Sequence, residues 1–134
     1  MADRPAQGGL GHDAPHLPTP APIEAYGNGG FRFGGLSHRG SLLFFPDGVW
    51  AWPVASITDV SEQTLAQAFA RGETLDVFLI GAGRDPALLP QRLRAMFHDL
   101  SISVDVMTTG AAVRTYNVLL AENRRAGAGL IAVD

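Results

Sequence analysis

The sequence contains no cysteine, which excludes disulfide bonds, thiolate nucleophiles and zinc sites built from cysteine. No apolar run approaches the length needed to span a bilayer, and the N-terminus lacks the basic and apolar regions of a secretory signal. The formal net charge of −3 argues against a general nucleic-acid-binding surface, which is usually strongly basic. We therefore expect no membrane insertion, no nucleic-acid partner and a cytoplasmic location.

Motifs for nucleotide binding and nucleophilic catalysis are also missing or incomplete. No Gly-Lys-Ser or Gly-Lys-Thr sequence occurs, which excludes a phosphate-binding loop of the NTPase type. Gly81 and Gly83 resemble half of a dinucleotide-binding fingerprint, but Pro86 occupies the place of the third glycine. Ser37 and His38 are neighbours, and neighbouring side chains in a strand point to opposite faces, so His38 cannot act as the base for Ser37. We expect no catalytic residues, no cofactor and no bound metal.

Length and composition indicate one folded domain that follows an N-terminal arm. The chain has 134 residues, of which 46% are hydrophobic and 17% are charged, as is usual for a globular domain with its own core. Residues 1–21 are rich in proline and glycine and show no hydrophobic periodicity, so we expect a flexible arm. Residues 22–134 are predicted to form a single α/β domain.

The first part of the domain is predicted to form two β-hairpins, because turn sequences rich in glycine, asparagine, aspartate and proline separate apolar segments. The strands are expected at 23–26, 30–33, 41–45 and 49–52. Trp50 and Trp52 share one face of their strand by period-two alternation. We assign both to the core, with an exposed interaction patch as the alternative. Ser61 is expected to cap a short helix over 62–70.

The central stretch of the sequence, residues 76–122, reads as strand, glycine turn, helix, strand, threonine turn and helix. Strands are predicted at 77–80 and 102–106. The helix between them should begin at Pro90, because proline is poorly tolerated inside a helix. Its apolar residues follow helical spacing and should form one stripe; they are Leu93, Met96, Phe97 and Leu100. Thr108 or Thr109 is expected to cap the second helix, and a last strand is expected at 127–133.

Two strands joined by one helix are most simply parallel, because such crossovers are long enough and right-handed. The turns 81–89 and 107–110 would then meet at the carboxyl edge of the sheet, where ligands of open α/β sheets usually bind. A cation near the start of a helix, such as Arg114, is explained if it faces an anion, or else if it is a solvated arginine over apolar surface. The candidate ligand- or partner-binding residues are Gly81, Gly83, Arg84, Thr108, Thr109, Arg114 and Asn117.

Asn117 also permits a structural interpretation. It follows Tyr116, which should face the core, so its amide lies at the margin of the apolar face. We expect this buried amide to tie the second helix to a neighbouring loop.

Four segments, in this order along the chain, carry a resemblance to a known family. They are Tyr26-Gly-Asn-Gly-Gly-Phe31-Arg-Phe33-Gly-Gly, Gly40-Ser-Leu-Leu with Pro46-Asp-Gly48, Leu79-Ile-Gly81-Ala-Gly83, and Met107-Thr-Thr-Gly-Ala-Ala-Val-Arg114-Thr-Tyr116-Asn117-Val-Leu119. Residues 22–133 thereby resemble the small family that includes the mitochondrial respiratory complex I assembly factor 3 and the adipogenesis-associated domain protein. The resemblance implies a three-layer α/β domain with a mixed central sheet, two main helices and an additional N-terminal β-hairpin layer. It also implies no established enzymatic activity.

Two classes of function therefore stay open. The first is a non-catalytic binding or assembly module whose partners would be respiratory-complex subunits or assembly factors, as the resemblance implies. The second is a small-molecule or anion-binding protein, or an enzyme, that uses the carboxyl edge of the sheet. The missing catalytic pairs favour the first class. The sequence leaves open whether the chain forms a homo-oligomer.

Overall fold

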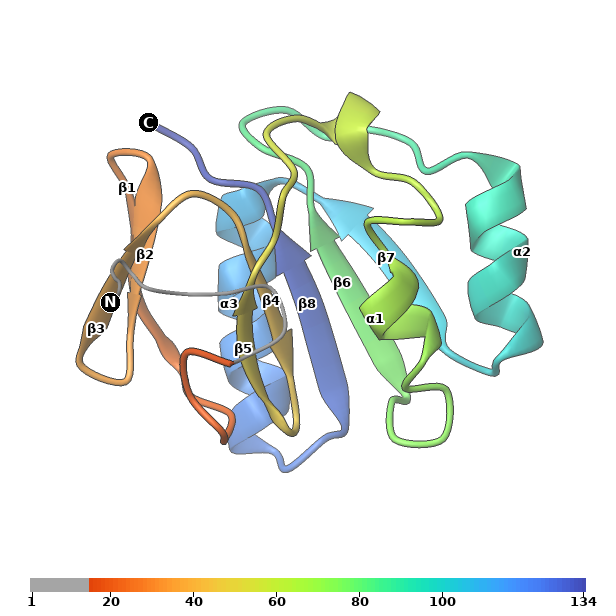
Figure 1. Ribbon diagram of the computed structural model, residues 1–134, viewed down its shortest axis with the longest axis horizontal. Coiled ribbons are helices and arrows are strands. Elements are labelled where there is room, and N and C mark those ends of the chain that lie inside the picture. The colour runs from red at the N-terminus through yellow and green to blue at the C-terminus, as the bar shows by residue number, and fades with distance from the viewer. Residues whose placement is uncertain (1–14) are drawn as a thin grey trace, which may run out of the picture.

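A mixed sheet of five strands forms the central layer of the computed structural model, which describes residues 15–134 (Figure 1). The strands are β4 (Leu42–Phe45), β5 (Gly48–Ala51), β6 (Val77–Gly81), β7 (Ser103–Met107) and β8 (Ala126–Leu130). Their order across the sheet is β5-β4-β8-β6-β7. β8, β6 and β7 are parallel, whereas β4 runs antiparallel to both β8 and β5. The predicted parallel pairing of β6 and β7, the two strands joined by one predicted helix, is confirmed. The predicted hairpin around Pro46-Asp47-Gly48 is also confirmed.

A second, smaller sheet contains three antiparallel strands and lies beside the first (Figure 1). Its strands are β1 (Ile23–Gly27), β2 (Gly30–Phe33) and β3 (Leu36–Arg39). The β1–β2 hairpin agrees with its turn sequence, but β3 was not predicted. Leu36-Ser-His-Arg has no apolar alternation and follows Gly34 and Gly35, so its sequence alone does not indicate a strand. β3 is formed instead by pairing with β2 along its whole length.

Helices cover both faces of the central sheet and make a three-layer α/β domain, as predicted. α3 (Thr109–Ala121) packs on one face together with the small sheet. The other face is covered by η1 (Ile57–Asp59), α1 (Ala66–Phe69) and α2 (Gln91–Asp99). α1 is shorter than the helix expected over 62–70. Ser61 and Thr64 bond each other's backbone N–H groups, at 2.8 and 3.2 Å, and so form a separate turn before the helix begins.

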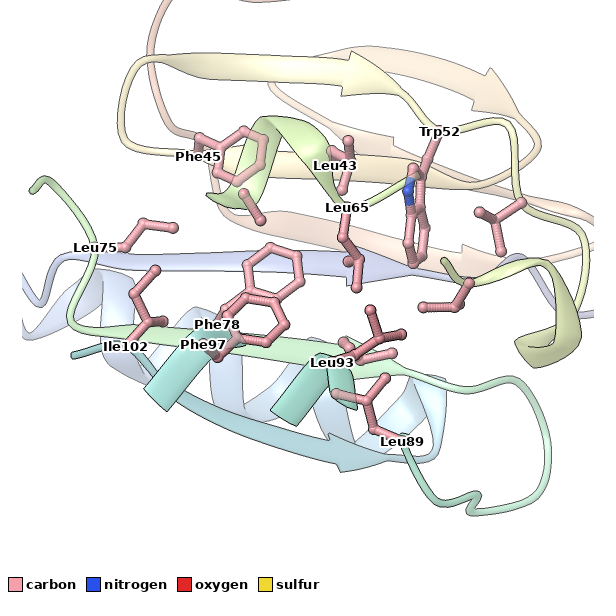
Figure 2. Close-up of a cluster of buried hydrophobic side chains, with 14 of the residues drawn as sticks. Leu43, Phe45, Trp52, Leu65, Leu75, Phe78, Leu89, Leu93, Phe97 and Ile102 are labelled. Carbon is pink, nitrogen blue, oxygen red and sulfur yellow. The ribbon is translucent and has the colours of Figure 1, made fainter. Parts of the chain in front are cut away.

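Stacked aromatic rings join the central sheet to α2 (Figure 2). Phe78 of β6 stacks on Phe97 of α2 at a centroid distance of 5.5 Å and lies 6.0 Å from Phe45 of β4. Trp52 is 3% exposed, and its indole N–H donates to the Thr64 carbonyl at 2.7 Å. Trp50 is 7% exposed, so the assignment of both tryptophans to the core is confirmed.

The residues before β1 lie against the edge of the central sheet. The His16 N–H donates to the Val49 carbonyl at 2.6 Å, and the Val49 N–H donates to the Leu17 carbonyl at 3.1 Å. Leu17 also packs against the core beneath α3. The expected arm therefore makes strand-like contacts in the part that begins at residue 15. Residues 1–14 of the arm lie outside the described residues. Within residues 15–134, no helix has the length and apolarity to cross a membrane.

Candidate functional site

The carboxyl ends of β6 and β7 meet at one edge of the sheet, as the sequence predicted. From β6 the chain continues to α2, and from β7 it continues to α3 on the opposite face. Such a reversal is the usual place for a ligand crevice in an open α/β sheet. Here the two loops are bonded to each other, because the Ala82 N–H donates to the Met107 carbonyl at 2.8 Å.

Thr109 fastens three segments together at this edge. Its hydroxyl donates to the Ile131 carbonyl at 2.7 Å and accepts from the Gly83 N–H at 3.0 Å. Its own N–H donates to the Gly83 carbonyl at 2.9 Å. Thr109 is fully buried, so its hydroxyl does not face solvent at the edge. Its side chain holds the loop after β6 against the chain after β8.

Thr108 and the two glycines also have identifiable structural roles. Thr108 is the N-cap of α3, and its hydroxyl accepts from the Ala111 N–H at 3.3 Å. A methyl group on Gly81 would lie 3.0 Å from the Thr109 Cα, so a larger residue would crowd α3 against β6. Gly83 has a φ of +104°, a conformation that side chains disfavour. The donors that the sequence placed at the edge are thus largely engaged inside the fold.

A shallow groove of about 410 Å³ lies above this edge. The loop after β6, the residues around η1 and the end of the chain line it. Arg84 is exposed there beside Asp85, and no carboxylate of residues 15–134 lies within the 4.0 Å ion-pair distance of Arg84. Leu88 in the same loop is 86% exposed. Gly83 and Arg84 are the predicted residues that line the groove.

Arg114 and Asn117 lie on the part of α3 that faces β1 and do not line the groove. The Asn117 amide accepts from the Ile23 N–H at 2.8 Å and donates to the Ile23 carbonyl at 2.9 Å. Asn117 therefore ties α3 to a neighbouring segment as expected, but its partner is the first residue of β1 and not a loop. Arg114 is exposed one turn after Gly110, where the Tyr26 ring approaches the helix. The candidate set is therefore divided between two places.

The imidazole rings of His16 and His38 lie in contact beside the small sheet. This contact was not predicted from the sequence. Nε2 of His16 lies 3.1 Å from Nδ1 of His38. Burial, together with a smaller effect of the neighbouring His38, lowers the pKa of His16 to about 4. Burial also lowers the pKa of His38, and a hydrogen bond that the ring donates to the Ser41 backbone opposes this shift. Both rings are therefore neutral near pH 7. Their separation of 22 residues gave no sequence signal.

The threonine hydroxyls at the carboxyl edge form no acid–base pair with another side chain among residues 15–134. The hydroxyls of Thr108 and Thr109 are used in hydrogen bonds, and neither has a histidine or carboxylate partner. Within residues 15–134, no group of three or more histidine, aspartate or glutamate side chains is placed to hold a metal ion. Arg84 and Leu88 are both exposed on the loop that follows β6.

Relatives of the chain include proteins with an assigned role. An uncharacterised protein of Rhodobacter capsulatus is 38% identical over 82% of this chain and 83% of its own length. The bovine NADH dehydrogenase [ubiquinone] 1 alpha subcomplex assembly factor 3 is 33% identical over 81% of this chain. The chain spans 59% of that factor. The match confirms the resemblance that the sequence motifs carried.

A solved structure shares both fold and sequence with the chain. The crystal structure of a Bartonella henselae protein, described as an outer membrane protein, superposes with a TM-score of 0.85 at 44% identity. The superposition covers 89% of this chain and 100% of the other. A family model described as "Protein of unknown function (DUF498/DUF598)" matches residues 23–131, from β1 to the end of β8, and the chain belongs to that family.

Proposed function

We propose that the protein is a non-catalytic binding module that assists the assembly of a respiratory NADH dehydrogenase by holding one of its subunits or another assembly factor. The observation that carries the proposal is the similarity to the bovine assembly factor, which extends over 81% of this chain. The family model spans residues 23–131, which include all the strands and helices of the structure.

The geometry of the carboxyl edge supports binding rather than catalysis. The Thr109 hydroxyl accepts from the Gly83 N–H and donates to the Ile131 carbonyl, so it maintains the shape of the edge. The exposed residues of the same loop include Arg84 and Leu88, together with Asp85 and Pro86. An exposed leucine beside an arginine suits a protein contact, since arginine is enriched at interfaces and a buried apolar side chain supplies affinity.

Pro86 and Pro90 restrict the loop that presents these side chains, because each proline fixes its own φ angle. A restricted loop loses little conformational entropy when a partner binds. The alternative function, a small-molecule or anion-binding protein or an enzyme at this edge, has less support because the Thr109 hydroxyl is not free to contact a ligand. A cytoplasmic location is part of the proposal.

Affinity capture from the native cells tests the proposal. Tagged full-length protein should enrich subunits or assembly factors of NADH dehydrogenase in quantitative mass spectrometry. The double variant Arg84→Ala/Leu88→Ala should lose this enrichment, because it removes the exposed cation and the exposed large apolar side chain of the loop. Arg124→Ala is the matched control, since Arg124 is exposed after the end of α3, and it should retain the enrichment. Equal enrichment by the double variant, or none by the wild type, would contradict the proposal.

A further inference from the structure

The small three-stranded sheet has one covered face and one open face. Phe31 and Phe33 of β2 point toward α3 and the central sheet and are 3% and 0% exposed. Alternate residues of β2 point the other way. Figure 1 shows the other elements of residues 15–134 on one side of this sheet. The outward face is hollowed by about 390 Å³.

Small residues make the floor of this hollow. Ala25 and Gly27 of β1, Gly30 of β2 and Ser37 of β3 all line it. A Cβ atom on Gly30 would lie 2.2 Å from the His38 carbonyl oxygen, so a larger residue cannot stand there without moving β3. The floor is therefore largely backbone, and a partner chain can approach it closely.

Two arginines, Arg32 of β2 and Arg39 of β3, also line the hollow. Arg32 pairs with Ser37, and Gly30 pairs with Arg39, so Arg32 and Arg39 are diagonal neighbours across β2 and β3. Such neighbours lie about 7–8 Å apart. Both side chains line the hollow, and Arg39 is steadied by donating to the Asn28 carbonyl at 3.2 Å.

Neither arginine is neutralised by a described carboxylate. Among residues 15–134, none lies within the 4.0 Å ion-pair distance of Arg32 or Arg39. Glu24 of the same sheet accepts instead from the Gly35 N–H at 3.1 Å. In a chain with a net charge of −3, this face is thus a local positive patch.

The spacing of the two arginines defines the ligand that fits. In an extended chain, residues i and i+2 point the same way and lie about 6.6–6.8 Å apart. Guanidinium groups bind carboxylates through two parallel hydrogen bonds. We propose that this face binds an extended acidic segment of a protein partner, in which two carboxylates separated by one residue pair with Arg32 and Arg39. The inference rests on the proposed function, since it names the chemistry of the partner.

The structure favours a peptide over a nucleic acid as the occupant. Binding of single strands relies on aromatic rings on which bases stack. Tyr26 and Phe31 line the hollow, but Phe31 is 3% exposed and the Tyr26 hydroxyl lies beside Gly110 of α3. The half-buried His38 ring also lines the hollow and is paired with His16 at 3.1 Å. The floor itself carries glycine, alanine and serine.

Fluorescence anisotropy with two labelled peptides of equal composition tests the inference on the full-length protein. Gly-Ser-Glu-Thr-Glu-Thr-Ser places both carboxylates on one side, whereas Gly-Ser-Glu-Glu-Thr-Thr-Ser places them on opposite sides. The first peptide should bind several-fold more tightly. Arg32→Ala and Arg39→Ala should each weaken its binding by about three- to fivefold, and the double variant by about tenfold or more. Arg124→Ala should leave it unchanged.

Arg32→Lys and Arg39→Lys keep the charge and lose the two-pronged hydrogen bonding, so binding should fall to an intermediate level. Equal binding of both peptides would overturn the inference, as would unchanged binding by the double variant. Equally effective competition by a short single-stranded DNA of the same charge would also overturn it. A thermal melt of each variant confirms folding, since these side chains are exposed. If no peptide binds, the inference about the small sheet is refuted. The proposed function is tested separately, by the enrichment of NADH dehydrogenase subunits.

Discussion

Replacing Asn117 by alanine removes the side-chain amide that joins α3 to β1. In the folded protein this amide makes two hydrogen bonds with the backbone of one residue, Ile23, at 2.8 and 2.9 Å. Ile23 is 5% exposed, so its N–H and carbonyl groups have little access to water once the amide is gone. The change therefore leaves a buried donor and a buried acceptor poorly satisfied.

The expected loss follows from the number of bonds. A typical hydrogen bond contributes about 1 kcal/mol net, and an unsatisfied buried group costs about 1–3 kcal/mol. Because Asn117 is itself half-buried and water can reach part of the gap, we expect Asn117→Ala to lower the free energy of unfolding by about 2 kcal/mol. For a chain of this length the melting temperature should fall by about 6–10 °C.

Urea denaturation at neutral pH measures this loss, and hydrogen exchange at the Ile23 amide locates it. Asn117→Asp is the matched variant, because it keeps an acceptor for the Ile23 N–H and loses the donor to the Ile23 carbonyl. Exchange at Ile23 should accelerate strongly in Asn117→Ala and less in Asn117→Asp. An unchanged melting temperature together with unchanged exchange at Ile23 in Asn117→Ala would refute the reasoning.

Three further perturbations test the core and the edges of the fold. Tyr116→Phe removes a buried hydroxyl without a protein partner among residues 15–134, so thermal melts should show equal or higher stability; a clear decrease would reveal a bound water or another partner. Thr109→Val leaves the Gly83 N–H and the Ile131 carbonyl unpaired and should cost about 3 kcal/mol in urea denaturation. Thr109→Ser should restore most of that loss, and equal stability of the two variants would contradict the role of the hydroxyl. Because the pKa of His16 is lowered to about 4 in the folded protein, the unfolded chain binds more protons between that value and about 6.5. Stability should then decline as the pH falls through this window, and a His16→Gln variant that keeps the same decline would show that another group causes it.

The elements that the sequence predicted well are those with local signals. Gly81 and Gly83 mark the end of β6, Pro90 marks the start of α2, and Thr108 caps α3 as one of the two expected residues. These features depend on the conformational limits of single residues, so they can be recognised without tertiary information. The parallel pairing of β6 and β7 followed from the crossover helix between them.

The features that the sequence did not predict depend on distant partners. The Thr109 hydroxyl donates to the Ile131 carbonyl, 22 residues away. Without knowledge of this partner, the sequence does not show that the hydroxyl is engaged inside the fold. The spacing of Arg32 and Arg39 depends on the pairing of β2 with β3, a strand without its own apolar pattern. Strand register and buried polar contacts of this kind arise from the whole fold, so a local pattern cannot specify them.

The amount of assembled NADH dehydrogenase in membranes of a deletion strain tests the central claim most directly. The account predicts less of the full complex on a native gel stained for NADH oxidation, together with smaller intermediates that contain its subunits. Wild-type protein and Arg124→Ala should restore the full complex, whereas Arg84→Ala/Leu88→Ala should not. A normal amount of full complex in the deletion strain, without intermediates, would contradict the claim that this protein is an assembly module.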